Sequence, residues 1–267
     1  MGYPAPTASI EAWRHSFAAI VELCADLSPA QWDTRSECPL WTVKDVCAHL
    51  VGGEEWMCAG HPRPEHGLAT IADDAVAARR DRGGAEVHEE LRTVFARRQR
   101  QLTDEPPDPD EPAFTAYGVP VPLGTLLSHR AFDLWVHEQD IRRALGVPGN
   151  LGTAGARLSA EILLASLPRV VAKLAAAPPE SVVRLTVDGE VAFDRAVTVD
   201  AGGRGHLAPW NGAGQDPTAR LRMDWETYSR LAAGRIAPDA AGVTASVTVD
   251  GDAALADRIL ARFAVTP

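Results

Sequence analysis

The sequence has 267 residues and a formal net charge of −10, with 46% hydrophobic and 23% charged residues. This composition is typical of a folded globular protein and excludes a mainly disordered chain. The acidic balance disfavours nucleic-acid binding, which needs a concentrated basic face, and no apolar run approaches the ~18 residues of a membrane span. The sequence starts without a charged leader or an apolar segment, so we expect a cytoplasmic protein without membrane partners.

Four amphipathic helices are predicted in the first part of the chain. Apolar residues three and four apart predict a first helix after Ser9, a third over about 85–102 and a fourth over about 123–145, which ends at Gly146. The second helix begins at Thr42, and Asp45 three residues later is typical of a capping box. Helices that each have one apolar face most simply form a bundle.

A Gly/Pro/Asn cluster at 146–150 predicts a domain boundary, which gives domains 1–150 and 151–267. The second domain is expected to start with a helix over 154–175. Alternating apolar residues then predict strands over 182–187 and 190–199, joined at Asp188-Gly189, and further strands over 219–223 and 243–249. Helices are predicted over 225–233 and up to about Phe263. The fold class is therefore a two-domain α+β protein, with a helical domain followed by a smaller α/β domain.

All four cysteines lie in the first quarter of the chain, without a Cys-x-x-Cys pair. A chain of this length does not need disulfides, and a reducing compartment would keep the thiols free. We expect them to serve mainly as small buried side chains: Cys24, Cys38, Cys47 and Cys58.

Polar residues on two of the predicted helices point to a metal site. Asp133 and His137 lie one turn apart on the same flank of the fourth helix, so they can bind one cation. His49 on the second helix also faces the edge of the bundle interior. Two imidazoles and one carboxylate leave a coordination position open, as in catalytic zinc sites. The same spacing also fits a surface Asp–His pair and a hydrogen-bonded histidine at the core edge.

Two segments carry a family resemblance. Residues 38–50 match the pattern C-P-x-W-T-V-x-D-V-x-x-H-L, and residues 130–146 match a second hallmark, R-A-F-D-L-W-V-H-E-Q-D-I-R-R-A-L-G. Both resemble the mycothiol-dependent maleylpyruvate isomerase family, whose N-terminal domain is a DinB-like four-helix bundle. The part of the chain from the boundary to residue 267 resembles the family's sterol-carrier-like domain. The resemblance implies metal ligands at His49, Asp133 and His137, although the characterised pattern has Glu where Asp133 stands.

The resemblance also implies the chemistry. A zinc-dependent, mycothiol-dependent enzyme would add a thiolate to an activated double bond, for cis-trans isomerisation of a small-molecule substrate or for thiol transfer. Arg82 and Arg142 are weak candidates to bind substrate carboxylates, and Glu54 is a candidate to orient a ligand. The alternatives are a thiol-independent metalloenzyme of the same fold in specialised metabolism and a non-catalytic protein that binds a small apolar ligand.

Overall fold

The computed structural model describes residues 6–63, 69–115, 118–212 and 216–266. It divides into two compact units, Met1–Ser159 and Ala160–Pro267. The division falls inside a helix, α7, whereas the sequence predicted a boundary after residue 150. Among the described residues, every helix is too short or too polar to cross a lipid bilayer.

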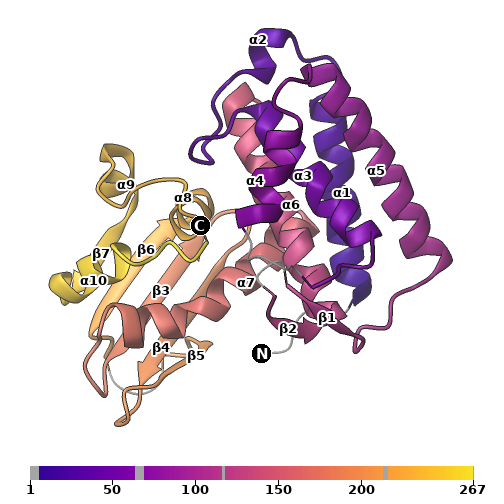
Figure 1. Cartoon of the computed structure of the whole chain (residues 1–267). Helices are drawn as coiled ribbons and strands as arrows, with labels where there is room; N and C mark the ends of the chain where they lie inside the picture. Colours follow the sequence, from indigo (N-terminus) through magenta and orange to yellow (C-terminus); the bar gives the residue numbers. More distant parts are fainter. Residues whose placement is uncertain (1–5, 64–68, 116–117, 213–215, 267) are drawn as a thin grey trace. The chain divides into compact units, whose positions relative to one another are not determined.

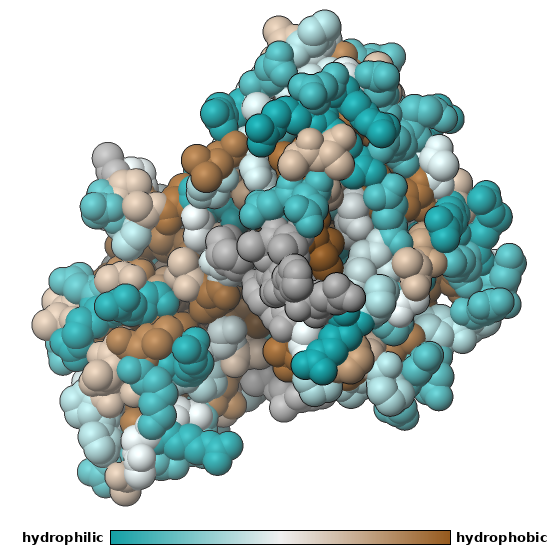
Figure 2. All heavy atoms as spheres, viewed as in Figure 1, coloured by the Kyte–Doolittle hydropathy of each residue, from teal (hydrophilic) through white to brown (hydrophobic). Residues whose placement is uncertain are grey.

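The first unit is helical, with one short hairpin (Figure 1). The helix α1 packs along α6, and α3 packs against both α4 and α5. The face of this unit that Figure 2 shows is mostly hydrophilic. Its elements are α1 (Pro6–Leu23), α2 (Pro29–Trp32), α3 (Val43–Cys58), α4 (Ala69–Ala78), α5 (Gly84–Asp104), β1 (Pro112–Phe114), β2 (Pro120–Pro122), α6 (Leu123–Leu145) and the start of α7 (Ala154–Arg169).

The four predicted helices correspond to α1, α3, α5 and α6, and α4 is an addition that the sequence pattern did not predict. Close packing accounts for α4. A Cβ atom added to Gly52 of α3 would lie 2.3 Å from the Cβ of Ala75, so α4 sits directly on the bare backbone of α3. Small residues at such a contact allow close approach but give little apolar periodicity, and this explains why the helix was missed.

Local signals fix the two helices that matter for function. Thr42 and Asp45 form the predicted capping box at the start of α3, with Thr42 N donating to Asp45 Oδ2 (2.9 Å) and Asp45 N donating to Thr42 Oγ1 (3.2 Å). The helix α6 ends at Gly146, which adopts the left-handed conformation with φ 67°. The start of α3 and the end of α6 are therefore determined by the residues at those positions.

The second unit contains a five-stranded sheet in the order β5-β4-β3-β6-β7. Strands β3 and β6 are parallel and the other neighbours are antiparallel. The predicted α+β class is confirmed. The elements after α7 are the π-helix η1 (Val170–Leu174), β3 (Val182–Asp188), β4 (Phe193–Val199), β5 (Gly205–Pro209), β6 (Ala219–Asp224), α8 (Trp225–Ala232), α9 (Ala241–Ser246), β7 (Thr248–Gly251) and α10 (Ala253–Leu260).

Two strand predictions in this unit were wrong in their bounds, and the strand predicted over 190–199 begins only at Phe193. The strand expected over 243–249 is instead a short helix, α9, followed by the strand β7. Val243 lies on α9, and its side chain is buried (4% exposed). A short apolar run has no periodicity that separates a strand from a turn of helix, and the tertiary position of Val243 decides between them.

Candidate metal centre

Two helices bring His49, Asp133 and His137 together. His49 lies on α3, and Asp133 and His137 lie one turn apart on α6. His49 Nε2 is 3.3 Å from Asp133 Oδ2, and His137 Nε2 is 3.6 Å from Asp133 Oδ1. The two imidazole rings meet edge to face, with centroids 4.9 Å apart. One ligand atom from each residue therefore lies within 4.8 Å of the others.

These separations suit a shared cation. Ligand atoms about 2.0–2.1 Å from a tetrahedral zinc ion lie roughly 3.4 Å from one another. The distances from His49 Nε2 to Oδ2 (3.3 Å) and from His137 Nε2 to Oδ1 (3.6 Å) are close to that value, each to a different oxygen of Asp133. The shorter side chain of Asp133, relative to glutamate, thus reaches both imidazoles. In chemistry and in spacing, the three residues fit a divalent metal.

Asp140 fixes the orientation of His137. His137 Nδ1 lies 2.9 Å from Asp140 Oδ2, and the side chains of the two residues are 6% and 0% exposed. The carboxylate accepts a hydrogen bond from Nδ1–H in the tautomer that carries the proton there, and this tautomer keeps a lone pair on Nε2, the nitrogen on the side of Asp133. A carboxylate behind a metal-binding histidine is the usual device for setting its tautomer. The sequence contained the signal, since Asp140 lies three residues after His137, but its role was not predicted.

Arg130 and Glu54 stand behind Asp133. Arg130 Nη1 donates to Asp133 Oδ2 (2.9 Å), and Arg130 Nη2 and Nε donate to Glu54 Oε1 (2.9 and 3.1 Å). Glu54 was singled out in the sequence as a residue that could orient a ligand, and it contacts Asp133 through Arg130 rather than directly. Arg130 was not singled out.

The electrostatic environment favours the metal-binding protonation states of Asp133 and His49. Burial opposes the charge on Asp133, but Arg130 and the imidazoles of His49 and His137 outweigh it and hold the pKa of Asp133 far below its usual range. Burial lowers the pKa of His49, although Asp133 acts in the opposite direction. At neutral pH Asp133 is therefore an anion and His49 is neutral, which are the forms that bind a metal.

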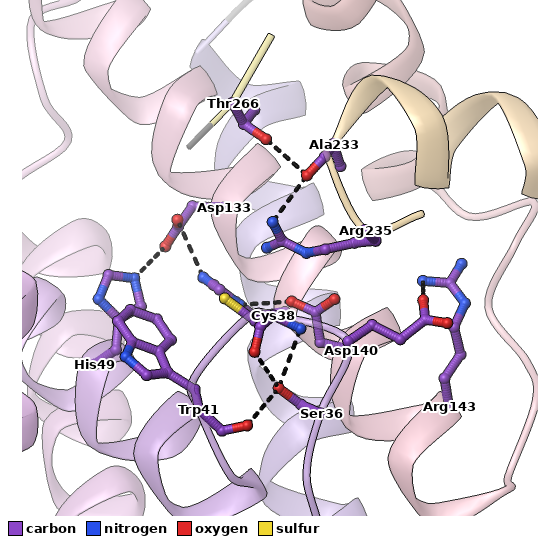
Figure 3. A network of polar contacts seen from close by, with 12 residues as sticks. Ser36, Cys38, Trp41, His49, Asp133, Asp140, Arg143, Ala233, Arg235 and Thr266 are labelled. Carbon is purple, nitrogen blue, oxygen red and sulfur yellow. Dashed lines mark hydrogen bonds and ion pairs between the residues drawn. The ribbon is translucent and has the colours of Figure 1, made fainter. Parts of the chain in front are cut away.

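Trp41 closes one side of the site. Its ring lies 4.9 Å from that of His49 and 5.8 Å from that of His137, between centroids. Figure 3 shows Trp41 beside His49, with Asp133 on the other side of the imidazole and Cys38 and Asp140 nearby. Cys38, His137 and Asp140 form a second group of potential ligands within 4.8 Å. Leu40, which precedes Trp41 in the chain, is 86% exposed and has a backbone φ of 73°.

The predicted substrate arginines already bind carboxylates. Arg142 Nε donates to Glu138 Oε1 (2.8 Å), and Glu138 is fully buried. Arg82 pairs with Glu90 of α5.

Two known families match this chain. Residues 13–142 match the family described as mycothiol maleylpyruvate isomerase N-terminal domain. Residues 164–262 match the SCP-2 sterol transfer family. Residues 13–142 therefore carry the N-terminal domain of the mycothiol maleylpyruvate isomerase family. No curated protein sequence matches the chain.

Solved structures of the family share the fold over almost the whole chain. The crystal structure of a mycothiol-dependent maleylpyruvate isomerase aligns with a TM-score of 0.61 at 16% identity, covering 94% of this chain and 96% of that one. A histidine-to-alanine mutant described by the same enzyme name aligns with a TM-score of 0.59, at the same identity and coverage. At this identity the likeness establishes the two-domain fold, and the chemistry has to be argued from the residues.

Proposed function

We propose that this protein is an enzyme of the maleylpyruvate isomerase type that uses mycothiol and a zinc ion held by His49, Asp133 and His137. The observation that carries the proposal is the convergence of these three donor groups within 4.8 Å, although His49 and Asp133 are 84 residues apart in sequence. The match of residues 13–142 to the mycothiol maleylpyruvate isomerase N-terminal domain supports the thiol and the reaction type.

The residues of the site would do three things. Asp140 holds the Nδ1 proton of His137, so that Nε2 remains a lone-pair donor. Asp133 supplies the negative charge, and its contact with Arg130 keeps the carboxylate in place. Trp41 covers the two imidazoles and excludes water from that side. When bound, zinc would lower the pKa of a thiol in the open position, so that thiolate is available at neutral pH.

The proposed reaction is an addition followed by an elimination. The thiolate sulfur forms a bond to one carbon of an activated cis double bond, and the π electron pair moves onto the conjugated carbonyl oxygen. Rotation follows about what is now a single bond. The electron pair then returns, the carbon–sulfur bond breaks, and the thiolate leaves the trans product. Thiol transfer would instead stop after the addition, with a proton taken up by carbon.

A reduced thiol substrate favours a reducing compartment, and we propose a cytoplasmic location on that ground. The four cysteines are thiols that form no disulfide with one another, which is compatible with such a location. Because Arg82 and Arg142 already pair with carboxylates, we assign no substrate-binding role to them.

Metal analysis and a thiol-dependent assay test the proposal. Purified wild-type protein should contain close to one equivalent of zinc, and His137→Ala should contain far less. Isomerisation of maleylpyruvate should then require added mycothiol. Equal turnover without the thiol would favour a thiol-independent metalloenzyme. Absence of a stoichiometric metal from the wild type would leave the non-catalytic binding protein as the remaining interpretation.

A further inference from the structure

Glu54 is a fully buried acidic residue near the metal centre. It lies on α3, one turn and a residue after His49, and its side chain is 1% exposed. Oε1 accepts two hydrogen bonds from Arg130, from Nη2 at 2.9 Å and from Nε at 3.1 Å. Oε2 has no hydrogen-bond partner among the described residues and faces Arg98 Nε at 3.9 Å.

The guanidinium of Arg130 connects this carboxylate to the proposed metal ligand. While two of its nitrogens bind Glu54 on α3, the third, Nη1, binds Asp133 Oδ2 on α6 at 2.9 Å. Space for the group comes from Gly53, since a Cβ at that position would lie 2.7–2.9 Å from three guanidinium atoms. The helix α3 therefore supplies both a counter-charge and a gap for one arginine side chain of α6.

Stability alone gives no reason for this arrangement. Taking an ion pair out of water costs free energy that the pairing roughly offsets, so apolar residues of similar volume would stabilise the bundle as well or better. Glu54 also leaves one buried oxygen without a hydrogen bond, which adds to that cost. What the arrangement does provide is a fixed position for the Asp133 carboxylate.

The charges are balanced in a way that suits a cation. Arg130 beside a divalent metal would repel it, and Glu54 at 2.9 Å offsets that positive charge. Together the guanidinium groups of Arg98 and Arg130 balance the carboxylates of Glu54 and Asp133. Arg130 can therefore hold the ligand without adding net charge to the centre.

We propose that Glu54 and Arg130 are positioning residues for Asp133, with Glu54 acting only through Arg130; this rests on the proposed function in that Asp133 binds the metal. Glu54 fixes the guanidinium, and the guanidinium fixes the carboxylate at the reach that the short aspartate side chain allows. Removing either group leaves the three ligands in the sequence but lets the carboxylate move.

Binding of Co²⁺ to the metal-free full-length protein tests this directly. Glu54→Gln keeps the shape of the side chain and removes its charge, and Arg130→Lys keeps the charge and removes the fork that binds two carboxylates at once. We expect each to weaken Co²⁺ binding by about 10- to 100-fold. The visible absorption of bound Co²⁺, which reports coordination geometry, should change as well.

A double variant separates a positioning role from a general structural one. If Glu54 acts through Arg130, then Glu54→Gln in the Arg130→Lys background should cause little additional loss of Co²⁺ affinity. Gly53→Ala keeps both charges and displaces the guanidinium, so it should weaken binding in the same way even where Glu54→Gln fails to fold. Independent, additive losses from the two substitutions would overturn the proposal.

Glu138→Gln is the matched control. Glu138 is a fully buried carboxylate whose Oε1 accepts hydrogen bonds from Arg142 Nε at 2.8 Å and from Asn150 Nδ2, and neither partner is one of the three ligands. It should lower the unfolding free energy as Glu54→Gln does but change Co²⁺ affinity less than about twofold. Wild-type affinity and spectrum in both Glu54→Gln and Gly53→Ala would overturn this inference alone. Failure of the wild type to bind Co²⁺ would overturn the proposed function as well.

Discussion

The hydrogen bond between His137 and Asp140 offers the most direct test of the metal centre. The two side chains are 6% and 0% exposed, and Nδ1 lies 2.9 Å from Oδ2, so solvent screens this contact very little. Asp140→Asn keeps the size of the side chain and removes its charge. The backbone of α6 and the ligands themselves stay unchanged.

The expected effect follows from the change in the type of hydrogen bond. A hydrogen bond to a charged group contributes about 1.5–3 kcal/mol and a neutral one about 0.5–1.5 kcal/mol. The difference of about 1–1.5 kcal/mol corresponds to roughly tenfold weaker metal binding. If the amide nitrogen turns toward the ring, its N–H donates a hydrogen bond to Nδ1, so Nδ1 carries the lone pair and the ring proton lies on Nε2. The loss is then larger, because a protonated nitrogen is not a ligand.

Competition with a chromophoric chelator measures the Zn²⁺ affinity of the wild type and of Asp140→Asn. Urea unfolding of the metal-free forms shows separately whether the fold is retained. Asp45→Asn is a suitable control, because Asp45 caps α3 through Thr42 and touches neither imidazole. Equal or tighter Zn²⁺ binding by a folded Asp140→Asn protein would refute the role assigned to Asp140.

Three further predictions follow from the same region. Asp133→Asn should weaken Zn²⁺ binding by about 100-fold in calorimetric titration while Asp133→Glu retains it; tighter binding by the amide variant would contradict ligation through the carboxylate. Burial lowers the pKa of His49, so the unfolded state binds the extra proton. The metal-free protein should therefore lose stability as pH falls below about 6.5, and His49 should contribute at most about 1.4 kcal/mol of that loss per pH unit. If His49→Gln has the same dependence of unfolding free energy on pH as the wild type, His49 is not the cause. The contact with Cys24 and burial raise the pKa of the Cys47 thiol. Iodoacetamide should therefore label Cys47 far more slowly than the half-buried Cys38. Similar labelling rates of the two thiols, measured by mass spectrometry, would contradict this prediction.

Some features of the site were determined by short-range sequence patterns. The capping box at Thr42 and the glycine at 146 delimit α3 and α6, and both were predicted because they depend on residues within one turn. The four-residue spacing of Asp133 and His137 places both on one flank of a helix regardless of what packs against it. The orientation of His49 and the division into two domains were also predicted from local patterns, and the family resemblance added the type of each domain and the role of the three residues as metal ligands.

The partners of Arg130 could only be found in three dimensions. Glu54 lies 76 residues before it, and no helical periodicity indicates that a guanidinium fits over Gly53. The same holds for α9, where an apolar run gave no local preference and Val243 packs from a helix rather than a strand.

Helical periodicity and capping residues thus determine where the helices lie in the chain and on which side of its helix each metal ligand is placed. The 3.3 Å separation of His49 from Asp133, and the arginine that stands behind it, result from how α3 and α6 pack. That packing is a property of the whole core, in which every buried side chain affects where two helices meet, and so it is decided only by the tertiary structure.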